Sequence, residues 1–250
     1  GTFNAAFVPS YSSELNKSKK SAELFANNIF NILFLSLLAI VFVIEIFMPL
    51  FVKLIAPGFT ENSEKLETAI NLTRITFPFL LFVSLSSFFS AILNSHNKFA
   101  AASATPIILN IILILVLLFG KFLADKLVYY ISYAVTFAGL IQLIFLIFFV
   151  RKHFIPKISF NFKNNQKIKL FFKKLFPSIF SSGVTQINIL IGTIIASFQA
   201  NAVSYLYYAD RIYQINLAIA GIAIGTVLLP SLSKYIDSKN TNKIEFIQNK

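Results

Sequence analysis

Six long stretches of the sequence contain no charged residue, and this feature constrains the fold more than any other. The stretches are 24–44, 75–97, 99–120, 127–150, 175–209 and 212–233. A helix that crosses a bilayer needs about 20 apolar residues, and every stretch is at least that long. Only 13% of the residues are charged, whereas soluble domains carry roughly 25%. The sequence therefore predicts an all-α, polytopic transmembrane helix bundle.

The fifth stretch is too long for a single span, because 35 residues would form a helix of roughly 52 Å against a hydrocarbon core of ~30 Å. We place a break at Phe198–Ala202. The predicted spans then lie near 28–53, 72–94, 102–120, 128–150, 175–198 and 203–232. Because the chain begins with Gly1 and ends in a polar segment, we expect it to be a fragment of a longer protein.

The positive charges are unevenly divided between the two ends of these spans. Sixteen Lys and Arg residues fall in one set of segments and three in the opposite set. Lys and Arg accumulate on the cytoplasmic side of membrane proteins, so the richer set is predicted to be cytoplasmic. The chain has a net charge of +12, and on the cytoplasmic side this charge would face anionic lipid headgroups. Nucleic acid is not an expected partner. The segments predicted to be cytoplasmic are 11–25, 94–101, 151–174 and 233–250.

The basic segment 151–174 divides the chain into 1–150 and 175–250. From Lys167 to Phe176, at its C-terminal end, four apolar residues recur at helical spacing between lysines, which is typical of a helix lying in the membrane interface. A solvated linker with snorkelling lysines is an equally open alternative. The four apolar residues are Ile168, Phe171, Phe172 and Leu175.

A short pattern, apolar-apolar-Pro-Ser-x-Ser, occurs at Pro9 and again at Pro230. Six predicted spans separate the two prolines, and an even number of spans returns the chain in the same direction. Two parallel repeats related by an axis along the membrane normal are therefore predicted, with 1–15 and 203–232 in equivalent positions.

Four ionisable residues lie within the spans or at their edges. Arg74 begins a span and is predicted to be an anchor that snorkels outward. Glu45 either faces a cavity or is protonated and packed. Arg211 lies about 12 Å inside the last helix, and arginines at such depth usually face a bundle interior or an aqueous cavity. We therefore predict that Arg211 forms a cationic site for an anionic group, phosphate above all. Asp210 would either orient a neighbouring residue or offset the positive field of Arg211 when no ligand is bound. An interfacial charge pair beside an aromatic belt is the alternative.

The sequence contains none of the patterns that predict an enzyme, a metal site or a cofactor. There are no cysteines, no Walker motif and no cluster of histidines and carboxylates within the spans. His96 and His153 are predicted to be solvated loop residues, far apart from each other. We expect no cofactor and no metal, and a membrane enzyme acting on polyprenyl phosphates is disfavoured.

Several motifs resemble those of one known family. They are "GTFNAAFVP", "APGF", "ITFPFLLFVSLSSFFSAILNSHNKF", "ASFQANAVSYLYYADRIYQ" and "GIAIGTVLLPSLSK", in this order along the chain. They resemble the MurJ/MviN family, the lipid II flippases of bacterial cell-wall synthesis in the MOP transporter superfamily. The resemblance implies an MOP-type two-lobe fold, incomplete here, with the end of the second helix through the eighth.

The resemblance also implies a function and a site. Family members move an undecaprenyl-diphosphate-linked peptidoglycan precursor across the bacterial inner membrane by alternating access. The expected substrate-binding residues are Arg211, Asp210, Tyr208 and Ser204. Some family members are described with a sodium site that uses an acid on the seventh helix. Here that helix offers Gln186 and Asn188 and no acid, so the resemblance does not imply such a site for this chain. Another MOP transporter, either a polysaccharide lipid flippase or a drug/cation antiporter, is the alternative.

Overall fold

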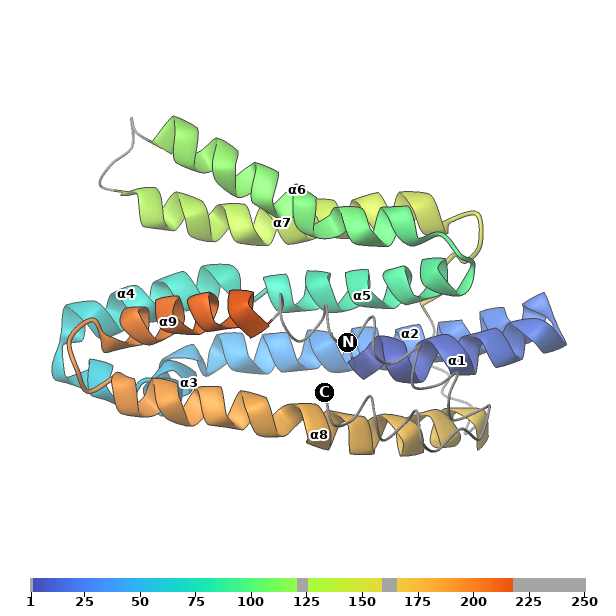
Figure 1. Ribbon diagram of the computed structural model, residues 1–250, viewed down its shortest axis with the longest axis horizontal. Helices are drawn as coiled ribbons and strands as arrows, with labels where there is room; N and C mark the ends of the chain where they lie inside the picture. The colour runs from blue at the N-terminus through green and yellow to red at the C-terminus, as the bar shows by residue number, and fades with distance from the viewer. Residues whose placement is uncertain (1, 121–125, 159–165, 218–250) are drawn as a thin grey trace, which may run out of the picture. The chain divides into compact units, whose positions relative to one another are not determined.

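The computed structural model describes residues 2–120, 126–158 and 166–217, and all regular structure in these ranges is helical (Figure 1). The prediction of an all-α fold is confirmed. The elements are α1 (Thr2–Lys17), α2 (Lys19–Ile46), α3 (Met48–Ile55), the 3-10 helix η1 (Pro57–Glu61), α4 (Ser63–Thr76), α5 (Phe79–Ser95), α6 (Phe99–Phe119), α7 (Leu127–Val150), α8 (Gln166–Ala196) and α9 (Ala202–Leu217).

Four of the described helical segments are long and apolar enough to cross a membrane, so the chain is a multi-pass membrane protein. They are Lys19–Ile46, Ser63–Ser95, Phe99–Phe119 and Leu127–Val150, and they overlap the first four predicted spans. The fifth predicted span falls in α8, and the sixth lies outside the described residues beyond Leu217.

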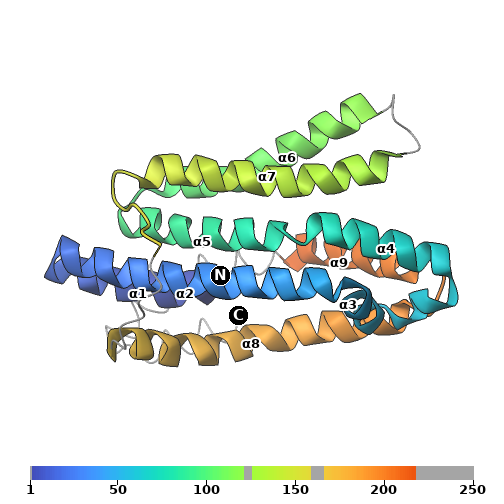
Figure 2. The ribbon, with the colours of Figure 1, turned by 180° about the vertical axis from the view of Figure 1, so that it is seen from behind.

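The chain divides into two compact units, Gly1–Ile194 and Ile195–Lys250. In the first unit, α5 packs against α1, α2, α6 and α7, and α6 packs along α7 (Figures 1 and 2). In the second unit, the described helix is α9. The proposed lobe boundary within 151–174 stays a prediction.

Aromatic side chains form the centre of the first unit. Phe7 of α1 is fully buried and packs edge-on against Phe88 of α5, with ring centroids 5.2 Å apart. One turn along α1, Tyr11 stacks on Phe7 at 5.5 Å. Helices in lipid gain no hydrophobic drive toward each other and associate through close packing. Each aromatic pair adds about 0.5–1.5 kcal/mol beyond the area that it buries.

The basic segment contributes to this centre through α8. Phe171 is 2% exposed and meets Phe7 edge-on at 6.2 Å, and Leu175 is buried beside it. Ile168 and Phe172 pack against the same cluster. This apolar face, for which a membrane interface and a solvated linker were both left open, packs on protein, because α1 and α2 offer it an aromatic surface.

The first predicted span, 28–53, is not one helix, and this part of the prediction is wrong. The helix α2 ends at Ile46, and α3 begins at Met48. Pro49 lies in the first turn of α3, and it has no N–H to donate to the carbonyl of Glu45. The chain breaks there, where a proline at the start of a helix costs least.

The second span carries a similar break at Phe77–Pro78, between α4 and α5. Pro78 interrupts the helical hydrogen-bond ladder, and the hydroxyl of Thr136 on α7 donates to the carbonyl of Ile75 at 2.6 Å. Threonine side chains commonly satisfy backbone groups that a proline frees within a membrane. This hydrogen bond therefore ties the break to α7.

The predicted break after the fifth span is confirmed. The helix α8 ends at Ala196 and α9 begins at Ala202. Between them, Asn201 has a φ of 60°, in the left-handed region that asparagine tolerates better than most residues. The turn sets the start of the helix that carries the predicted site.

Candidate functional site

The helix α9 places three of the four predicted site residues on one side. Ser204, Tyr208 and Arg211 are spaced by four and three residues, and residues at these spacings are neighbours on a helix surface. All three are exposed in the described part of their unit. Tyr208 has 65% of its surface exposed. Asp210, the fourth, is partly buried.

Arg211 is held by two neighbours on its own helix. Its Nη1 donates to Oε1 of Gln214 at 3.4 Å, and its Cζ lies 4.9 Å from the centroid of the Tyr207 ring. A guanidinium over an aromatic face is attracted by the ring quadrupole. These two contacts orient the side chain, and a guanidinium has five N–H donors in total.

Asp210 is connected to Arg211 through Gln214. Nε2 of Gln214 donates to Oδ2 of Asp210 at 2.6 Å, while its Oε1 accepts from Arg211. Asp210 and Arg211 therefore share Gln214 as a hydrogen-bond partner, and the role of Asp210 toward a ligand stays a prediction. The sequence analysis missed Gln214, although its spacing of four and three residues from the two charges is the local signal for such contacts.

Such an arrangement is chemically suited to a phosphate group. The planar guanidinium can donate two parallel hydrogen bonds to phosphate oxygens, and it does not lose its charge. The hydroxyls of Ser204 and Tyr208 lie on the same side of α9 as further donors.

Two intramembrane charges that the sequence analysis treated separately form a pair. Nε of Arg74 on α4 lies 3.6 Å from Oε2 of Glu45 on α2. The sequence predicts Arg74 to be a snorkelling anchor, and the structure gives it Glu45 as an ionic partner. Each residue lies within four positions of a proline break, so the pair joins α2 and α4 beside the two breaks.

The prediction that His96 and His153 lie far apart is wrong. Their rings stack, with centroids 4.2 Å apart, because His96 follows the end of α5, His153 follows the end of α7, and these two helices pack on each other. The hydroxyl of Tyr11 lies 3.2 Å from Nε2 of His96. Burial lowers the pKa of His96, and nearby His153 and Lys19 lower it further. Among the described residues no group of three metal-binding side chains occurs.

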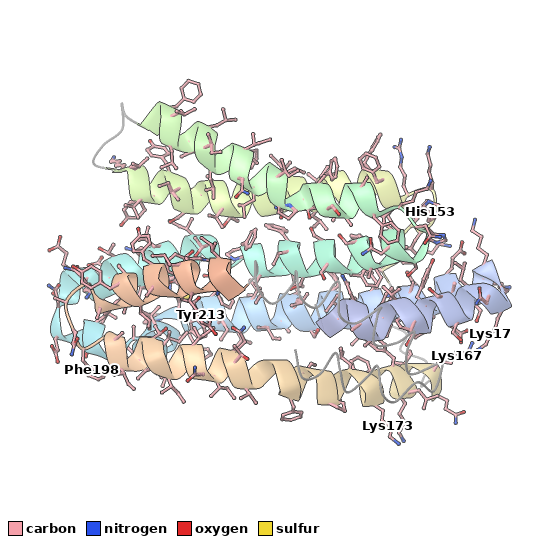
Figure 3. The ribbon with its side chains drawn as sticks, viewed as in Figure 1. Lys17, His153, Lys167, Lys173, Phe198 and Tyr213 are labelled. Atoms are coloured by element: carbon pink, nitrogen blue, oxygen red, sulfur yellow. The ribbon has the colours of Figure 1, made fainter. Side chains whose placement is uncertain are left out.

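Glu14 links α1, α2 and α8 at the same end of the first unit. Its carboxylate accepts hydrogen bonds from Lys17 at 2.8 Å, from Lys167 at 2.6 Å and from the hydroxyl of Ser21 (Figure 3). Burial on its own would raise the pKa of Glu14, but these hydrogen bonds lower it to about 2. The carboxylate is therefore charged at neutral pH and ties the basic segment to the bundle.

Comparisons with known proteins identify the family. All 250 residues match the family model described as "Lipid II flippase MurJ". A "Probable lipid II flippase MurJ" of Rickettsia prowazekii is 40% identical over the whole chain and 49% of its own length. One of Rhizobium tropici is 39% identical over the whole chain and 48% of its own length.

A solved structure, "Lipid II flippase MurJ, inward closed conformation", has a TM-score of 0.76 and 30% identity over 98% of this chain and 50% of that one. The chain thus spans about half the length of the relatives that it matches. The family match covers every described helix, α9 with its arginine included. The chain therefore belongs to the lipid II flippase MurJ family.

Proposed function

We propose that the protein containing this chain is a flippase that moves a lipid-linked peptidoglycan precursor across the bacterial cytoplasmic membrane. The observation that carries the proposal is the family match over residues 1–250. The precursor would pass from the cytoplasmic to the periplasmic leaflet by alternating access, and the protein would not act as an enzyme. The names of the similar proteins favour this function over another MOP transporter.

In this proposal, Arg211 binds the diphosphate of the precursor, and Ser204, Tyr208 and Asp210 complete the site. The exposed guanidinium, oriented by Gln214 and Tyr207, supports that role. An arginine in a membrane helix is costly unless it meets water, a partner or a ligand. A diphosphate supplies the opposite charge and a geometry that matches the guanidinium.

The proposed organisation follows the sequence analysis. Residues 1–150 would belong to the N-terminal lobe, and residues 175–250 would begin the C-terminal lobe. Residues 151–174 would connect them on the cytoplasmic side, with lysines such as Lys173 facing anionic lipids (Figure 3). Membrane lipids and the precursor are the proposed partners, and nucleic acid is not one.

Arg211→Ala in the complete protein tests the site. Losing hydrogen bonds to a charged group costs about 1.5–3 kcal/mol, which corresponds to roughly ten- to a hundredfold in affinity. We expect the variant to reach the membrane at normal abundance and to fail in supporting cell-wall synthesis when the native protein is depleted. Arg211→Lys should rescue in part, because it keeps the charge and loses the planar fork.

Tyr213→Phe is the matched control, since Tyr213 lies on the same helix and is 62% exposed (Figure 3). It should remain active. If Arg211→Ala supports growth as well as the native protein does, the arginine is an interfacial anchor and the site is assigned wrongly.

A further inference from the structure

A polar pocket lies within the first unit, between α1, α5, α6 and α7, and has a volume of about 360 Å³. Eight of its eleven lining residues carry a hydroxyl or an amide, and none of the eleven is charged. Small polar residues often serve as contacts between membrane helices. Here, however, they surround a space large enough for about twelve waters at ~30 Å³ each.

The helix α5 supplies the largest share of the lining, five of the eleven residues. Ser86, Ser87, Ser90 and Asn94 line the pocket, and their spacing of one, three and four residues keeps them on one side of a helix. The stripe extends about 12 Å along the helix. A continuous polar stripe on a membrane helix has to meet something other than lipid.

Two residues that line this pocket each carry a buried polar atom with no hydrogen-bond partner among the described residues. The atoms are Oγ of Ser86 and Oδ1 of Asn4, which belong to different helices, α5 and α1. Ser86 is only 4% exposed. A buried polar group without a partner is unfavourable, and more so where the surroundings are apolar. Both atoms point to an occupant that can donate or accept hydrogen bonds.

The depth of the pocket makes lipid headgroups unsuitable as that occupant. Ser86 lies nine residues before the end of α5 at Ser95, or about 14 Å at 1.5 Å per residue. Gln142 is at a similar depth on α7, where its amide donates to the carbonyl of Thr105 at 2.7 Å. The inner end of the pocket is thus close to the middle of a ~30 Å hydrocarbon core.

The chemistry of the lining selects the class of ligand. With no positive charge among its lining residues, the pocket cannot offset the desolvation of a phosphate. Hydroxyls and amides, in contrast, both donate and accept, as sugar hydroxyls and acetamido groups do. Asn94 and Phe99 form the outer end, where the charge pattern predicts the cytoplasm. Phe99 is 56% exposed there and offers a ring to the apolar face of a sugar.

We propose that the polar pocket binds the uncharged sugar head of the lipid-linked precursor, with Ser86 and Asn4 as direct hydrogen-bond partners. The inference rests on the proposed function and adds to it the residues that would recognise the sugar. The polar lining of the pocket is the reason for assigning the sugar to the first unit, and this reason does not involve Arg211.

Ser86→Ala separates this proposal from a role in packing. Removing a hydroxyl that has no partner should leave the free energy of unfolding unchanged or raise it. If Ser86 only packs against its neighbours, the variant should therefore lose neither stability nor affinity for a ligand. If the hydroxyl binds a sugar, affinity should fall about three- to tenfold, as expected for one neutral hydrogen bond. Ser84→Ala is the matched control, because Ser84 is on the same helix and outside the lining of the pocket.

The experiment measures binding of two lipids to the purified complete protein in lipid nanodiscs. One is lipid II, and the other is undecaprenyl diphosphate, which has no sugar. We expect Ser86→Ala to weaken lipid II binding and leave undecaprenyl diphosphate binding unchanged. Ser84→Ala should alter neither, and Arg211→Ala should weaken both.

The outcomes separate the two proposals. If the native protein binds lipid II and Ser86→Ala binds it equally well, the pocket holds water only and the inference is overturned while the proposed function stands. If Ser86→Ala weakens both lipids equally, recognition of the sugar is likewise refuted. If the native protein binds neither lipid, the proposed function fails and the inference fails with it.

Discussion

Replacing Lys167 by methionine removes the hydrogen bond between the basic segment and Glu14 while keeping an unbranched side chain that is one atom shorter. Nζ of Lys167 donates to Oε2 of Glu14 at 2.6 Å, and the Glu14 side chain is 7% exposed. A hydrogen bond to a charged group contributes about 1.5–3 kcal/mol. The Lys167 side chain is 40% exposed, so water reduces this value. We expect Lys167→Met to lower the free energy of unfolding by about 1.5 kcal/mol.

The assay is equilibrium unfolding of the complete protein in mixed micelles, and an exposed pair on the same part of the chain supplies the control. Lys19 lies 3.9 Å from Glu23, with side chains 74% and 47% exposed. Surface pairs of this kind contribute about 0–1 kcal/mol, so Lys19→Met should cost much less. A double-mutant cycle with Glu14→Gln should show that Lys167 and Glu14 are coupled.

The effect should also depend on pH in a defined direction. Because the pKa of Glu14 is lowered from 4.5 to about 2 on folding, its contribution is present above pH 4.5 and is lost as the pH falls toward 2. The difference between the native protein and Lys167→Met should shrink over that interval. Equal costs for Lys167→Met and Lys19→Met, or a difference that acid does not change, would refute the reasoning.

Two further predictions concern packing and orientation. A Cβ on Gly139 would lie 2.5 Å from Cδ2 of Phe79, whereas one on Gly183 would meet nothing within 4 Å. Gly139→Ala should therefore destabilise by about 1–3 kcal/mol and Gly183→Ala should be neutral or stabilising, as measured by unfolding; equal effects would contradict the packing of α5 on α7. In intact cells, an impermeant thiol reagent should label Ser63→Cys and spare Ile155→Cys in this cysteine-free chain. The reverse labelling would invert the topology derived from the positive charges.

The spans were predictable because their signal is local. Absence of charge over 20 residues is enough to indicate a membrane helix, and the predicted 102–120 and 128–150 lie close to Phe99–Phe119 and Leu127–Val150. The charge pattern alone does not indicate the break before Pro49, because a proline leaves an apolar run uncharged. Proline carries a local signal of its own, so the sequence did contain it.

The contacts between helices could not be predicted in the same way. Glu14 and Lys167 are 153 positions apart, and the two stacked histidines lie in different loops. Nothing local in the sequence indicates that such residues meet, because the packing of several helices decides it. Arg211, in contrast, stands out as a charge beside an uncharged run, and Gln214 could have been added from helical spacing alone.

The two proline breaks have a mechanical consequence. The helices α3 and α4, joined by η1, pack on each other, and Phe51 meets Phe77 edge-on at 5.5 Å. At each end this hairpin continues into a long helix through a joint where a proline has already removed a backbone hydrogen bond. A continuous helix resists bending because the bend must stretch its ladder, whereas a bend at these joints has no such bond to stretch. The orientation of the α3–α4 hairpin is therefore fixed by side-chain contacts, namely the Thr136 hydroxyl and the Glu45–Arg74 pair. Single substitutions at these residues can change how freely the hairpin tilts.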